Sequence, residues 1–98
     1  MDTDRILAIL RSHAPELQAA GLAHLRLFGS VARGEATPHS DIDLLADYDP
    51  EKTVTLLTLG GLDQRLREIL GTDVDLCSAN LLKPQARERA LREAVVVF

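Results

Sequence analysis

The sequence has little cysteine and few aromatic residues, with one Cys, two Phe, one Tyr and no Trp among 98 residues. The lone Cys77 excludes a disulfide within the chain and is typical of a reducing compartment, so we expect a cytoplasmic protein. So few aromatic rings also leave no platform on which unpaired bases could stack.

Positive charge and long apolar runs are scarce as well. Eleven Lys and Arg residues stand against fifteen Asp and Glu, which gives a formal net charge of −4. Binding to nucleic acid needs clustered cations that contact phosphates, so we expect no direct nucleic-acid partner. No apolar run approaches the ~20 residues of a membrane span, and the acidic start of the chain does not suit a signal peptide. We therefore expect no membrane partner.

What remains is the composition of a small globular protein. Hydrophobic residues make up 46% of the chain and charged residues 27%, which is ordinary for a folded domain. No internal repeat or linker interrupts the sequence, so we expect residues 1–98 to form a single domain.

Apolar periodicity predicts alternating helices and strands. Helices are expected at 3–11, 15–20, 53–70 and 85–93, and strands at 22–28, 41–48 and 73–77. A helical turn is expected at 30–33 and a loop at 35–40, where Ser40 could orient the residue after it. The β-prone residues 95–98 form either a last strand or an apolar tail covered by a partner. The alternation predicts the α/β (α+β) fold class.

Two adjacent glycines, Gly60 and Gly61, lie inside the expected helix 53–70. Each is unfavourable there by roughly 1 kcal/mol relative to alanine. We interpret them as marking a kink or a close contact between this helix and the sheet.

One stretch combines several features that suit phosphate and metal binding. Gly29 and Ser30 end an apolar run, and Asp41 and Asp43 follow after ten residues. Gly29 can adopt backbone angles closed to other residues, and Ser30 stands where a helix could begin and hold an anion. On a strand, Asp41 and Asp43 would point to one side and the apolar residues between and after them to the other. Two carboxylates facing a Gly-Ser turn suit an Mg²⁺ ion that also holds a triphosphate.

Other motifs fit the stretch less well. Gly29 and Gly34 have the glycine spacing of a phosphate-binding loop, but Glu35 stands where that loop needs lysine. The aspartate pair lacks the glycine that a calcium loop needs at its sixth position. A plain alternative is a tight turn followed by a strand with solvated aspartates.

Residues 28–34 read Phe-Gly-Ser-Val-Ala-Arg-Gly, and residues 40–45 read Ser-Asp-Ile-Asp-Leu-Leu. Together they resemble the signature of the DNA polymerase beta-like nucleotidyltransferases, in particular the minimal nucleotidyltransferases that include MNT antitoxins paired with HEPN-domain toxins. The resemblance covers nearly the whole chain, with residues 74–76 and 93–98 as weaker matches. It implies a small mixed β-sheet of about three or four strands with helices packed on one side.

The resemblance also implies roles for individual residues. Asp41 and Asp43 would bridge two Mg²⁺ ions around the triphosphate of ATP. Ser30 and the turn at Gly29 would hold the β- and γ-phosphates, with help from Arg33. From the residue alone, Arg33 could instead cap local carbonyl groups, although a guanidinium group suits phosphate oxygens.

A third carboxylate is implied on the strand 73–77. Asp73, Asp75 and Cys77 share one face of that strand, and spacing alone does not choose between the two aspartates. In the resembled family the third carboxylate lies between two apolar residues, which matches Asp75. Asp75 would hold the metal nearest the acceptor hydroxyl and help to remove its proton. Cys77 reads as a small, partly buried filler.

The function that follows from the resemblance is transfer of AMP from ATP to a tyrosine of a HEPN-domain toxin, which the antitoxin thereby neutralises. Two alternatives stay open. The protein could transfer AMP to a small molecule such as an aminoglycoside, or it could neutralise a HEPN partner by contact alone.

Overall fold

The computed structural model describes residues 3–35 and 41–98. Its helices are α1 (Thr3–Ser12), α2 (Ala14–Ala19), α3 (Gly29–Ala32), α4 (Leu56–Leu70) and α5 (Pro84–Glu93), with a short 3-10 turn η1 (Ala79–Leu81). Its strands are β1 (Leu22–Phe28), β2 (Ile42–Tyr48), β3 (Val74–Ser78) and β4 (Val95–Val96). These elements confirm the expected alternation. Most of the expected loop 35–40, including Ser40, lies outside the described residues.

The strands form one mixed sheet in the order β3-β2-β1-β4. The central pair β1–β2 is antiparallel, whereas β2 and β3 run parallel. In this register Asp43 of β2 pairs with Phe28 of β1 on one side and with Asp75 of β3 on the other. The α/β (α+β) class and the small mixed sheet are therefore confirmed.

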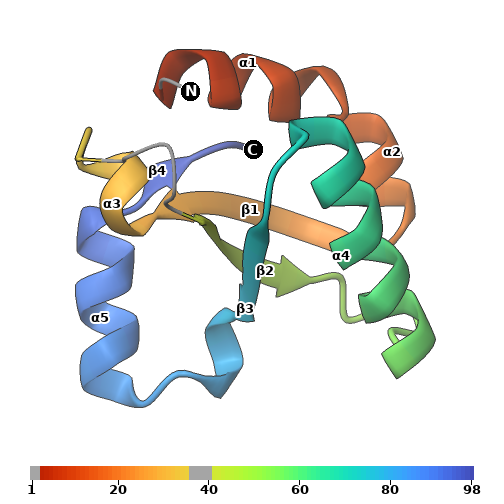
Figure 1. Cartoon of the computed structure of the whole chain (residues 1–98). Helices are drawn as coiled ribbons and strands as arrows, with labels where there is room; N and C mark the ends of the chain where they lie inside the picture. The colour runs from red at the N-terminus through yellow and green to blue at the C-terminus, as the bar shows by residue number, and fades with distance from the viewer. Residues whose placement is uncertain (1–2, 36–40) are drawn as a thin grey trace.

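Helices α1, α2 and α4 cover one face of the sheet (Figure 1). The main core contains Ile6, Leu17 and Leu66 from these helices together with Leu44 from β2. Successive strand residues face opposite sides, so Leu45 lies on the other face, where it packs with Ala79 of η1 and Ala90 of α5. The sheet thus has one face buried by three helices and one covered only in part, by η1 and α5.

Helix α4 begins one turn later than the pattern predicts, because of its cap. Thr55 and Thr58 form a reciprocal capping box, in which the Thr58 N–H donates to the Thr55 hydroxyl at 3.2 Å. The helix ends at Leu70, where Gly71 takes the left-handed conformation with φ +68°. A side-chain oxygen just before a helix accepts hydrogen bonds from its free N–H groups. A left-handed glycine just after a helix lets backbone N–H groups bond to the last free carbonyls.

The interpretation of Gly60 and Gly61 as a close helix–sheet contact is wrong. A Cβ atom built on either glycine meets no neighbouring atom within 4 Å. Both side-chain positions point to open space, so packing within the described chain does not require glycine at either one.

The last residues form a strand and not a free tail. Strand β4 pairs antiparallel with β1, and the Val97 N–H donates to the Leu25 carbonyl at 2.9 Å. Arg11 of α1 donates to the carbonyls of Val96 and Val97 at 2.8 and 2.9 Å. Val97 is buried, whereas Val96 remains more than half exposed. The chain end is therefore held by both the sheet and the first helix.

Among residues 3–35 and 41–98, no helix combines the length and apolar character that crossing a bilayer requires.

Candidate active site

Two acidic side chains lie side by side on the sheet face that α1, α2 and α4 leave uncovered, and a third acidic residue stands just before one of their strands. Ile42 and Leu44 are buried in the main core, which places Asp43 on the opposite face. Asp75 is the register partner of Asp43 on the parallel neighbour β3. Paired residues of adjacent strands point to the same side, so the two carboxylates lie next to each other. Asp41, just before β2, is exposed.

The turn between β1 and α3 passes directly against Asp43. Gly29 has φ +76°, a backbone conformation that side chains disfavour. A Cβ atom at residue 29 would collide with Oδ2 of Asp43 and would lie 3.1 Å from its Cγ. Both the backbone angle and the neighbouring carboxylate therefore require glycine. The structure brings the Gly-Ser turn and the aspartate strand together, as the sequence predicts.

Helix α3 carries Ser30 and is held in place by two contacts of Val31. Val31 is buried at 3% exposure in the main core, and its carbonyl accepts a hydrogen bond of 2.7 Å from the Thr3 hydroxyl. Ser30 is half-buried in the first turn of this helix, directly after Gly29. These two contacts of Val31 hold α3 in place directly after Gly29, the residue that lies against Asp43.

Arg33 pairs with two carboxylates, and these contacts leave its predicted role at a phosphate untested. Its Nε lies 3.0 Å from Glu35 Oε2, and its Nη1 lies 3.6 Å from Glu93 Oε2 on α5. The hydrogen bond to Glu35 and the charge of both glutamates raise the pKa of Arg33. Burial and the neighbouring carboxylates raise the pKa of Asp43, and the charge of Arg33 opposes that rise in part. Sequence analysis missed Glu93 because it lies far along the chain on another helix.

The surroundings of Asp43 raise its pKa above the ordinary value. Burial raises the pKa of Asp43 most, and the charges of Asp75 and then Asp41 raise it further, against the lowering by Arg33. A nearby positive charge would relieve this repulsion. Oxygen ligands of this kind are those that Mg²⁺ prefers.

Whether these aspartates suit Mg²⁺ depends on how many of the ligands of the ion must come from the protein. Within the described part of the chain, no three His, Cys, Asp or Glu side chains form a ready-made metal cluster. Mg²⁺ usually keeps several waters and binds one or two carboxylates together with substrate phosphates, so a closed protein cage is not required. Asp41, Asp43 and Asp75 therefore fit Mg²⁺ that is bound together with a nucleotide.

Two neighbours of Asp75 differ in what they do. Asp73 forms an ion pair of 2.7 Å with Nη1 of Arg67 on α4, which ties it to the outside of the helix layer. Cys77 donates a weak hydrogen bond of 3.8 Å from Sγ to Oδ1 of Asp75. Burial, and then the carboxylates of Asp75 and Asp43, raise the pKa of the Cys77 thiol, so it stays protonated. The geometry favours Asp75 over Asp73 as the third acidic residue. That Cys77 lies near Asp75 could have been predicted, because the two residues share one face of the strand.

Comparison with known proteins decides the family. Residues 4–97 match the nucleotidyltransferase domain family. The chain belongs to this family. It is 38% identical over 95 residues to the protein adenylyltransferase MntA of Thermococcus cleftensis, covering 96% of this chain and 94% of that protein. A Methanocaldococcus jannaschii protein, provisionally named a protein adenylyltransferase, is 39% identical over 90 residues, or 92% and 95% of the two chains. The expected nucleotidyltransferase enzyme is thus confirmed at the level of the family.

Solved structures agree with this assignment. A structure provisionally described as a minimal nucleotidyltransferase superposes with a TM-score of 0.76 at 40% identity, covering 97% of this chain and 95% of that one. A toxin–antitoxin structure with AMP-PNP gives 0.69 at 23% identity, covering 100% and 73%. A tri-AMPylated Shewanella oneidensis HEPN toxin in complex with its MNT antitoxin gives 0.59 at 22% identity, covering 98% and 68%. At these lower identities the likeness concerns the fold alone.

Proposed function

We propose that this nucleotidyltransferase transfers AMP from ATP to a tyrosine hydroxyl of a HEPN-domain toxin and thereby neutralises it. One observation carries the proposal: Asp43 and Asp75 are register partners on parallel strands, with Gly29 directly against Asp43. Two acidic side chains beside a glycine turn are the arrangement that metal-assisted phosphoryl chemistry needs. The use of ATP and the single cysteine are in keeping with a cytoplasmic protein. We also propose that residues 1–98 form one domain.

The described residues divide the work between binding and proton removal. Ser30 and the turn at Gly29 bind the phosphates, and Asp41 and Asp43 provide the ligands for Mg²⁺. When bound there, Mg²⁺ withdraws charge from the phosphates and holds the triphosphate in place. Asp75, exposed at the start of β3, accepts the proton of the incoming hydroxyl. The hydroxyl oxygen then bonds to the α-phosphorus, and pyrophosphate leaves.

The acceptor is proposed from the openness of the site and from the relatives. Asp41 and Asp75 are both exposed, so no other part of the described chain covers them. An acceptor delivered by a docked protein arrives already aligned, whereas a free small molecule must lose more entropy. The name of the Thermococcus relative and the tri-AMPylated Shewanella toxin complex support a protein acceptor of the HEPN class.

A second candidate is neutralisation by contact without turnover. It is favoured by the two glutamates that pair with Arg33 and compete with a phosphate for it. Transfer to a small molecule such as an aminoglycoside has no such support.

The deciding experiment mixes the protein with its HEPN partner, ATP and Mg²⁺ and measures the mass of the partner. We expect an added AMP on a partner tyrosine that is absent with the double variant Asp41→Asn/Asp43→Asn. A tight complex without added mass, in which the double variant neutralises the toxin as well as wild type, would establish the contact-only function instead.

A further inference from the structure

Asp75 is exposed, whereas its register partner Asp43 is half-buried. The pairing of the two strands does not fix the direction of the Asp75 side chain, because like charges on adjacent strands repel each other. An exposed side chain also has several rotamers open to it. A carboxylate that accepts a proton from an incoming hydroxyl must lie within hydrogen-bond reach of that hydroxyl. The proposed role of Asp75 therefore depends on a further contact that holds its carboxylate.

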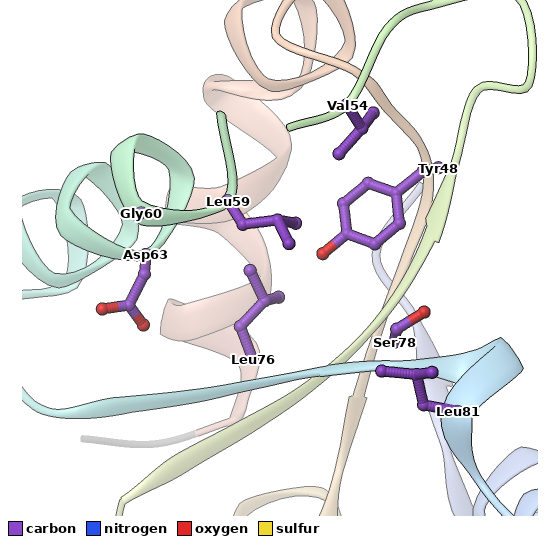
Figure 2. Close-up of a pocket in the computed structure, with 8 residues that line it drawn as sticks. All are labelled: Tyr48, Val54, Leu59, Gly60, Asp63, Leu76, Ser78 and Leu81. Carbon is purple, nitrogen blue, oxygen red and sulfur yellow. The ribbon is translucent and has the colours of Figure 1, made fainter. Parts of the chain in front are cut away.

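Cys77 provides that contact. Residues two apart on a strand point to the same side, so Cys77 shares the face of Asp75. Leu76 between them points the other way, into a hollow of about 640 Å³ beside α4, together with Leu59 and Tyr48 (Figure 2). The Sγ atom of Cys77 lies 3.8 Å from Oδ1 of Asp75. In the described part of the chain, no other side chain donates a hydrogen bond to Asp75.

Packing fixes the position of the thiol. Cys77 is only partly exposed, and its register partner on β2 is Leu45, which is fully buried. The thiol packs against the small cluster of Leu45, Ala79 and Ala90, which joins β2 to η1 and α5. A close-packed side chain has little freedom to move. The hydrogen bond therefore restricts the exposed carboxylate far more than it restricts the sulfur atom.

We propose that Cys77 is a positioning residue, which holds the carboxylate of Asp75 at the site through an S–H···O hydrogen bond. The catalytic consequence rests on the proposed function, whereas the hydrogen bond does not. One bond to Oδ1 leaves Oδ2 for the incoming hydroxyl, since a carboxylate has two accepting oxygens. A thiol is a weak donor, whereas a strong donor would stabilise the ionised carboxylate and make it a poorer base.

The alternative is that Cys77 only fills space in the apolar cluster. Two substitutions separate these roles. Cys77→Ala removes the donor and adds no polar group, whereas Cys77→Ser keeps a donor but brings a hydroxyl into apolar surroundings. A filler would tolerate alanine at least as well as serine in every measurement. A positioning residue predicts that serine is the better replacement for activity and not the better one for stability.

The rate of AMP transfer to the HEPN partner measures the first ranking. Cys77→Ala should lower kcat by about three- to tenfold, the size expected for one lost hydrogen bond. The KM for ATP should stay unchanged, because Ser30, Asp41 and Asp43 are the residues proposed to bind ATP. Cys77→Ser should retain more of the wild-type kcat than Cys77→Ala, although its Tm is equal or lower. A kcat of Cys77→Ala that equals or exceeds that of Cys77→Ser overturns the proposal.

Infrared spectroscopy tests the hydrogen bond without turnover. The chain contains one cysteine, so the S–H stretching band of the protein belongs to Cys77 alone. A hydrogen bond lowers the frequency of this band, and Asp75→Ala, which removes the acceptor, should therefore raise it. The matched control Asp73→Ala removes the nearby carboxylate that pairs with Arg67 and should leave the band unchanged.

The two readouts distinguish the positioning contact from the proposed function. An S–H band at the same frequency in wild type and in Asp75→Ala overturns the contact, whatever the activity of the protein. A band that shifts as expected, in a wild-type protein that transfers no AMP to its partner, supports the contact and overturns the proposed function.

Discussion

Gly29 lies so close to Asp43 that a methyl group on residue 29 would overlap a carboxylate oxygen. The glycine is needed for two separable reasons, its left-handed backbone and the proximity of the carboxylate. Gly34 offers a natural comparison, because it has a similar φ of +72° but no atom within 4 Å of a built Cβ.

Replacing each of these glycines with alanine separates the two effects. Gly29→Ala and Gly34→Ala should both lower the free energy of unfolding, by about 1–2 kcal/mol, through backbone strain. Only Gly29→Ala should also displace Asp43 and abolish the rise in Tm caused by Mg²⁺ and ATP. Chemical denaturation measures the first effect and thermal unfolding with ligand the second. Equal ligand responses in the two variants would remove Gly29 from the nucleotide site.

Asp43→Asn should have opposite effects on the free and the bound protein. The pKa of Asp43 is raised by burial and by Asp75 and Asp41, so its ionised form is disfavoured by folding at neutral pH. The uncharged asparagine removes this repulsion, and the protein without ligand should unfold at an equal or higher Tm. The rise in Tm with Mg²⁺ and ATP, which comes from binding to the folded state alone, should be largely lost. An undiminished rise would contradict the metal site.

Asp75→Asn and Asp73→Asn should differ in activity. Asp75→Asn should abolish AMP transfer and spare much of the nucleotide binding, because Asp75 is assigned to the acceptor side. Asp73→Asn breaks an exposed ion pair with Arg67 and should cost less than about 1 kcal/mol of stability, with transfer retained. Transfer assays and nucleotide titrations of both variants decide this. The reverse ranking would move the third carboxylate by two residues along β3.

Glu93→Gln should strengthen ATP binding if Arg33 contacts phosphate. Glu93 and Glu35 now share the guanidinium group of Arg33, and a phosphate must compete with both carboxylates for it. Removing one competitor should lower the Kd for ATP severalfold, whereas Glu88→Gln on the same helix should leave it unchanged. If Glu93→Gln weakens binding instead, Glu93 positions Arg33 and does not compete for it.

The features predicted well from the sequence are those set by neighbours along the chain. The alternation of apolar and acidic residues around Asp43 predicted which face of β2 is buried and which is open. The turn at Gly29 and Ser30 was predicted because the backbone freedom of glycine depends on that residue alone. The pairing of Arg33 with Glu93 was not predicted, because it depends on how α5 returns to α3. Gly60 was misinterpreted for a related reason, since a helix pattern does not reveal which positions face open space.

The attachment of β4 to β1 and to Arg11 has a consequence for folding. Strand β4 forms the edge of the sheet beside β1, and Arg11 of the first helix holds the carbonyls of Val96 and Val97. A nascent chain still lacking residues 95–98 on the ribosome would leave the backbone of β1 unpaired along that edge and Arg11 without these acceptors. An open strand edge invites pairing with other chains. Residues 95–98 therefore close an edge of β1 that would otherwise be open to pairing with other chains.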